Sequence, residues 1–77
     1  MKIDEMKNIT WLVENGGDLT IGSIGSIPCA AVASDEHSML AAVAKRPEET
    51  LTELLLRLDT AIENAWNGQE FLDEINQ

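Results

Sequence analysis

An amphipathic segment, residues 51–66, constrains the fold more than any other feature of this sequence. Its apolar side chains recur at the 3.6-residue spacing of one helical stripe: Leu51, Leu54, Leu55, Leu58, Ala61, Ile62, Ala65 and Trp66. Thr50 and Glu53 predict a capping box at its start, in which each side chain accepts a hydrogen bond from the other residue's backbone N–H. Asn67 and Gly68 predict its end. Because a one-sided helix must bury its stripe, the chain needs a second layer.

The residue pattern in the middle of the chain predicts that this second layer is a small antiparallel sheet. Residues 19–24 alternate with a period of two, which is typical of a strand. Residues 25–28 predict a turn, and the small apolar residues 29–33 predict a second strand. Residues 39–44 fit either a third strand or an alanine-rich helix, which their local propensity favours. We predict a strand there, because two strands alone form a marginal sheet.

The N-terminal residues 4–15 predict a short helix. Asp4 is placed to cap its start, and Asn15-Gly16-Gly17 is typical of a helix end. The competing interpretation is a hairpin, because residues 9–13 are rich in strand formers and Asn-Gly is a hairpin turn signal. We prefer the helix. The expected fold is then a single α+β domain over residues 1–77, in the order α-β-β-β-α, with about three antiparallel strands and an acidic tail at 69–77.

Charge and cysteine content exclude several classes of protein. The formal net charge is −9, and residues 47–77 carry eight acidic residues against one basic residue, Arg57. Such a surface repels nucleic acids and anionic membranes, so neither is an expected partner. No segment has the apolar length of a membrane span, and the first residues lack the apolar stretch of a signal peptide. Cys29 is the only cysteine, which fits a reducing compartment, so we expect a cytoplasmic protein.

The sequence offers no constellation of catalytic or metal-binding residues. Cys29 and His37 are the only residues of their types, and zinc sites need three or four such ligands, usually at a short paired spacing. Adjacent acidic residues on solvated turns do not form a carboxylate pair with one raised pKa. No glycine-rich segment matches a phosphate-binding loop. We therefore expect no enzyme activity, no metal and no cofactor.

Candidate interaction residues lie on the final helix and in the tail. Leu56 falls off the apolar stripe, beside Asp59 and Glu63, and is either an isolated exposed leucine or a contact to a partner or a second copy. In the tail, the spacing of the apolar residues suits a short helix folded back on the domain or an amphipathic peptide that docks into a partner. The six candidates are Leu56, Asp59, Glu63, Phe71, Leu72 and Ile75.

One family resemblance covers about 35 residues. The order of small strands followed by a leucine-rich helix resembles the HicB-type antitoxin domains, in which a short sheet leads into a helix that begins Thr-x-x-Glu. Thr50 and Glu53 match that helix start. Glu48 or Glu49 stands where that family prefers glycine, and the family's appended DNA-binding segment has no counterpart here. The order α-β-β-β-α also resembles that of a double-stranded-RNA-binding domain, although the acidic charge opposes that activity.

Two functional hypotheses follow. The first is an acidic interaction protein, antitoxin-like or inhibitor-like, that sets residues 47–77 against a basic protein surface. The alternative is a homodimeric structural or assembly module that associates through a sheet edge or Leu56. The first predicts salt-sensitive binding, and the second predicts an association that persists at high salt.

Overall fold

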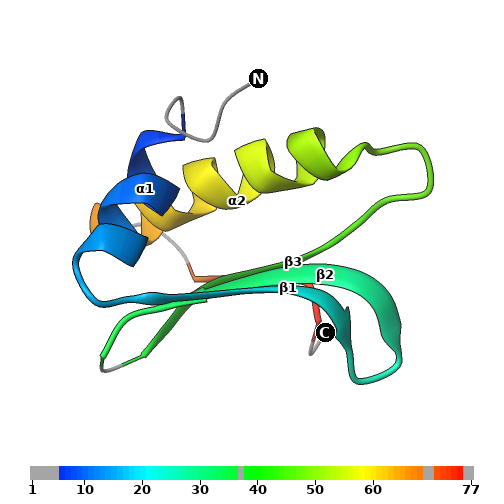
Figure 1. The fold of residues 1–77 in the computed structure, drawn as a ribbon, viewed down its shortest axis with the longest axis horizontal. Coiled ribbons are helices and arrows are strands. Elements are labelled where there is room, and N and C mark those ends of the chain that lie inside the picture. The colour runs from blue at the N-terminus through cyan, green and yellow to red at the C-terminus, as the bar shows by residue number, and fades with distance from the viewer. Residues whose placement is uncertain (1–5, 37, 69–70, 76–77) are drawn as a thin grey trace.

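Two helices lie on one face of a four-stranded sheet, which confirms the predicted α+β class (Figure 1). The computed structural model describes residues 6–36, 38–68 and 71–75. The elements are, in chain order, α1 (Lys7–Glu14), β1 (Asp18–Ile24), β2 (Ile27–Ser34), β3 (Met39–Ala44), α2 (Leu51–Trp66) and β4 (Leu72–Asp73). Figure 1 also shows that no further element covers the opposite face of the sheet in the described part of the chain.

The sheet is mixed, and it has one strand more than the sequence predicts. The strand order is β1-β2-β3-β4, with antiparallel pairs β1/β2 and β2/β3. The last pair, β3/β4, is parallel and sets Ala41 opposite Leu72 and Ala42 opposite Asp73. Helix α2 is the crossover that parallel neighbours require, because it carries the chain back to the end of the sheet where β3 begins.

Strand β2 begins earlier than expected, at Ile27 instead of Cys29, so Pro28 lies in a strand and not in a turn. A proline cannot donate a backbone hydrogen bond, and within sheets it occurs at edges and strand starts. The pairing of β2 with β3 begins only at Ala30, opposite Ala44. Pro28 therefore precedes the doubly paired part of β2, where it interrupts no ladder.

The core lies between α2 and the two central strands. Leu54, Leu58 and Ile62 of α2 are fully buried against Ala31 and other small residues of the sheet. The third strand has the predicted bounds, 39–44, and its residues 40–43 are all buried. Burial in the sheet thus outweighs the helical propensity of its alanines, because propensity differences are well under 1 kcal/mol per residue.

Helix α1 confirms the helical interpretation of the N-terminal segment, and the hairpin interpretation is wrong. The helix ends in a Schellman motif, in which the N–H of Gly17 donates to the carbonyl oxygen of Leu12 at 2.8 Å. Gly16 supplies the left-handed conformation that this motif needs, with φ +89°. The proposed cap, Asp4, lies outside the described residues. The structure places the N-cap at Met6, which gives no side-chain hydrogen bond.

Candidate functional site

The chain's two tryptophans lie together on the surface. The ring centroids of Trp11 and Trp66 are 5.2 Å apart, and their planes meet at 79°, which is an edge-to-face contact. Trp11 remains 56% exposed and Trp66 38% exposed. Aromatic rings of this size are normally buried, and exposed tryptophans are the residues most enriched among binding hot spots. The pair is therefore the first candidate for an interaction site.

Two hollows flank the tryptophan pair, and the side chains that line them differ in charge. One hollow is lined by both indole rings together with Lys7 and Asn8. The other is lined by both rings together with Asn15, Asp35 and Glu36. The second hollow thus combines aromatic surfaces with carboxylates, which is the chemical composition of a site for a cationic group. We refer to it as the Trp–carboxylate hollow.

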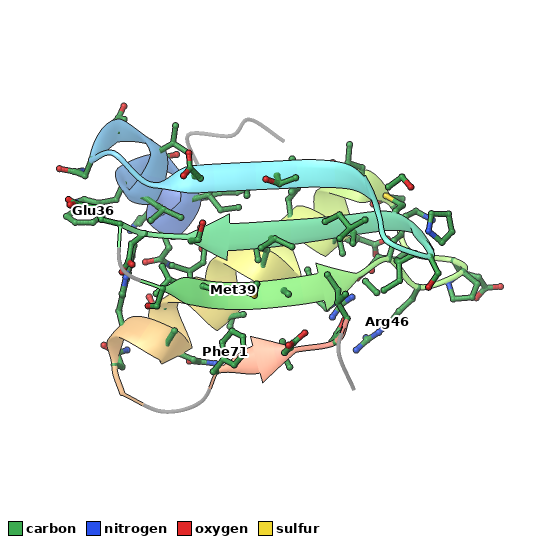
Figure 2. All side chains as sticks on the ribbon, turned by 90° about the horizontal axis from the view of Figure 1, so that it is seen from below. Glu36, Met39, Arg46 and Phe71 are labelled. Atoms are coloured by element: carbon green, nitrogen blue, oxygen red, sulfur yellow. The ribbon has the colours of Figure 1, made fainter. Side chains whose placement is uncertain are left out.

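The turn between β2 and β3 places the carboxylates of the Trp–carboxylate hollow. The N–H of Ser38 donates to Oδ1 of Asp35 at 2.8 Å, and the N–H of Asp35 donates to the carbonyl oxygen of Ser38 at 2.9 Å. These two bonds fix the turn. The next residue, Glu36, is exposed and has no hydrogen-bond or ion-pair partner among the residues that the structure describes. Figure 2 shows it at the opposite end of the sheet from Arg46.

Asp59 of α2 fixes the helix that carries Trp11. Its Oδ1 accepts hydrogen bonds from the backbone N–H groups of Asn8 and Ile9, both at 2.9 Å, and its Oδ2 accepts one from Asn8 Nδ2 at 3.0 Å. The first N–H groups of a helix have no partner within the helix, so this carboxylate caps α1 from 50 residues away in the chain. The sequence places Asp59 on an interaction surface, whereas the structure turns it inward as an intramolecular cap.

Leu56 and Leu72, two of the predicted interaction residues, come together in the structure. They line a shallow groove between α2 and β4, with Thr60 and Asn64 on the helix side. Both leucines are half-buried and pack against the core, so Leu56 is not the isolated exposed leucine that its helical position suggested. Contact of Leu56 with a partner stays a prediction.

The remaining candidates lie apart from one another. Phe71 is 53% exposed. Figure 2, which views the sheet from the side opposite the helices, shows Phe71 beside β4. Ile75 is half-buried, and Glu63 is exposed on α2. The tail forms neither the predicted helix nor a detached peptide, because β4 pairs with β3. Residues 69–70 and 76–77 of the predicted tail lie outside the described residues.

A three-residue ionic cluster fastens the tail to the domain. Arg57 bonds through Nε to Glu49 Oε2 at 2.6 Å and through Nη1 to Glu74 Oε2 at 2.8 Å. Its Nη2 donates to the carbonyl oxygen of Ala44 at 2.9 Å. The guanidinium lowers the pKa of Glu49 to about 2, chiefly through the direct hydrogen bonds, and the two carboxylates raise the pKa of Arg57. The cluster joins α2, the preceding loop and the segment after β4.

Intramolecular contacts occupy many of the carboxylates in residues 47–77. Glu49 and Glu74 bind Arg57, and Asp59 caps α1. Glu53 completes the predicted capping box, in which it accepts from the N–H of Thr50 at 2.8 Å and donates its own N–H to Thr50 Oγ1 at 3.1 Å. Several carboxylates of the acidic C-terminal third are therefore engaged within the molecule, and the carboxylates near the tryptophans come from another part of the chain.

Other kinds of site gain no support from the described ranges. In residues 6–36, 38–68 and 71–75, no three His, Cys, Asp or Glu side chains are grouped so as to hold a metal ion. Cys29 is half-buried and packs against the core, and His37 lies outside the described residues. Neither helix of the described chain has the length and apolar composition needed to cross a bilayer.

Comparison with known proteins gives no assignment: no family model, no curated protein and no solved structure matches this chain. The HicB-type resemblance therefore stays a prediction.

Proposed function

We propose that this protein is a non-enzymatic binding module that holds a Lys or Arg side chain of a partner protein in the Trp–carboxylate hollow. The observation that carries the proposal is the exposed, perpendicular pair of Trp11 and Trp66 beside Asp35 and Glu36. A cation over an indole face gains about 0.5–2 kcal/mol, the larger value when the contact is desolvated. Nearby carboxylates add electrostatic attraction, which chiefly raises the association rate.

The charge of the whole chain supports a basic partner. With a net charge of −9, the protein attracts cationic surfaces at long range, and this attraction weakens as salt is added. The proposal keeps the antitoxin-like or inhibitor-like interaction expected from the sequence, but it moves the contact from the acidic side chains of residues 47–77 to the tryptophan pair with Asp35 and Glu36. Within the same proposal, the protein works in the cytoplasm, where the single Cys29 stays reduced.

A titration with a short peptide that alternates glycine and arginine tests the proposal. The two indole N–H signals in a nitrogen–proton correlation spectrum report on Trp11 and Trp66 individually. We expect both signals to shift with the arginine peptide and neither to shift with its citrulline counterpart, which keeps the shape but lacks the charge. A lysine peptide tests whether the hollow selects a planar guanidinium or accepts any cation.

Two variants and a matched control sharpen this test. Trp66→Ala should weaken binding about tenfold, which corresponds to about 1.4 kcal/mol. Glu36→Gln changes only an exposed side chain, so it should fold normally and reduce both the affinity and its dependence on salt. Phe71→Ala removes the other aromatic residue, away from the hollow, and should leave binding unchanged. Equal binding of the citrulline peptide, or full binding by Trp66→Ala, would refute the proposal.

A further inference from the structure

The two edges of the sheet differ in whether other groups hydrogen-bond to their outward-pointing backbone N–H and C=O groups. At the β3/β4 edge, β4 is only two residues long, and beyond it side chains take the place of a neighbouring strand. The N–H of Ala44 donates to Glu74 Oε1 at 3.0 Å, and its carbonyl oxygen accepts from Arg57 Nη2 at 2.9 Å. Short strands and charged side chains are the devices by which proteins prevent an edge from pairing with another chain. This edge is closed.

The opposite edge, β1, has none of these devices along most of its length. The strand is seven residues long and pairs with β2 on one side only, so alternate backbone N–H and C=O groups point away from the sheet. Within the described residues, no other element or side chain is bonded to that side of residues 19–24. Residues 19–34 contain no charged side chain, although a quarter of the whole chain is charged.

The side chains of β1 add exposed apolar surface to this open edge. Ile21 lies opposite Ala31, which belongs to the core beneath the helices, and so Ile21 faces the helix layer. It is nevertheless 42% exposed. Helix α2 packs mainly on β3, and α1 contacts β1, which leaves Ile21 without a helix fully covering it. An apolar residue on an open edge strand is surface that a second strand would bury.

From these observations, we infer that β1 pairs antiparallel with β1 of a second copy of this chain, so that the two sheets become one continuous sheet. Antiparallel pairing of identical strands is self-complementary, as a two-fold symmetric interface requires. The uncharged segment 19–34 lets two strongly acidic chains approach without placing like charges opposite each other. This dimer does not rest on the proposed function, because the tryptophan pair lies on α1 and α2.

The regular part of β1 fixes the register of this interface. The pairing of β1 with β2 is regular from Asp18 to Gly22 and irregular after it. With the two-fold axis at Thr20, Leu19 of each copy lies opposite Ile21 of the other, which gives two apolar cross-strand pairs. The two Asp18 residues are then four positions apart along the strand, or about 13 Å. This separation exceeds the screening length of about 8 Å at physiological salt.

Sedimentation equilibrium of wild type, Ile21→Lys and Met39→Lys tests the inference. Wild type should sediment at twice the chain mass of 8.4 kDa, and the dimer should persist at high salt because backbone hydrogen bonds and apolar contacts hold it. Ile21→Lys should weaken dimerisation at least tenfold, because it adds a charge beside the paired strand. Met39→Lys is the matched control, since Met39 has the same 42% exposure but lies on β3. It should dimerise like wild type.

Amide hydrogen exchange of the wild-type protein gives a second readout that needs no variant. In a monomer, the β1 amides that point away from β2 exchange quickly, whereas in the dimer they are protected and their protection grows with protein concentration. A wild-type mass of 8.4 kDa at all concentrations would overturn the inference. Equal weakening by Ile21→Lys and Met39→Lys would also overturn it. Neither result bears on the peptide titration that tests the proposed function.

Discussion

Replacing Asp59 with alanine tests how the domain holds the helix that carries Trp11. The Asp59 carboxylate accepts three hydrogen bonds from the first turn of α1, two of them from backbone N–H groups that have no partner within the helix. Asp59→Ala leaves these donors unpaired at a partly buried position. The N-cap residue, Met6, provides no side-chain hydrogen bond in its place.

The hydrogen bonds of Asp59 determine how much stability the alanine variant should lose. Loss of an ordinary N-cap side chain costs about 1 kcal/mol, and hydrogen bonds to charged groups contribute about 1.5–3 kcal/mol each. Allowing for water that reaches the partly buried donors, we expect Asp59→Ala to lower the free energy of unfolding by about 2–3 kcal/mol. A 77-residue domain has about 4–11 kcal/mol in total. The melting temperature should therefore fall by about 10–20 °C.

Asp59→Asn separates hydrogen-bond geometry from charge. Both backbone N–H groups donate to the same oxygen, Oδ1, so an asparagine oxygen in that position can still accept both. We expect Asp59→Asn to cost about 1 kcal/mol, less than the alanine variant, because the charge and the second oxygen are lost. Glu63→Ala, which removes an exposed carboxylate from the same helix, should change stability by less than about 0.5 kcal/mol.

Urea unfolding followed by tryptophan fluorescence measures these differences. Near-ultraviolet circular dichroism of Asp59→Ala should also lose intensity before global unfolding, because Trp11 moves with α1 while Trp66 stays on α2. Equal stability of Asp59→Ala and Glu63→Ala would refute the capping role. An Asp59→Asn variant as unstable as the alanine variant would show that the negative charge provides the stabilisation, and not the two hydrogen bonds that Oδ1 accepts from the backbone.

Two further predictions concern the ionic cluster and the end of α1. Because Arg57 lowers the pKa of Glu49 from 4.5 to about 2, the stabilisation from Glu49 is complete above about pH 4.5 and is lost as the pH falls towards 2. Urea midpoints of wild type and Glu49→Gln between these pH values should converge at the acidic end. Gly17→Ala would place a Cβ 2.3 Å from Leu12 Cδ1 and 2.9 Å from Leu12 O, so thermal unfolding should show a loss of about 1–3 kcal/mol. A neutral Gly17→Ala would contradict the tight turn.

Local sequence signals determined most of the elements. The capping box and the spacing of the leucines predict the bounds of α2 correctly, because both act within a few residues of one another. Gly16 and Gly17 predict the end of α1 for the same reason. For residues 39–44 the sequence left helix and strand open, and the need for a third strand identified the correct structure. The class of the fold follows from these elements, since a one-sided helix and small apolar strands must bury each other.

Only the tertiary structure decided which side chains meet. Trp66 belongs to the apolar stripe of α2 by its spacing, yet its ring is partly exposed and lies against Trp11. Asp59 has the helical position of an exposed residue, yet its carboxylate is turned to the first turn of α1. Strand β4 forms because α2 returns the chain beside β3. With only two residues, it is too short to show the alternating pattern of a strand in the sequence. Contacts between segments about 50 residues apart depend on packing geometry, which no local periodicity encodes.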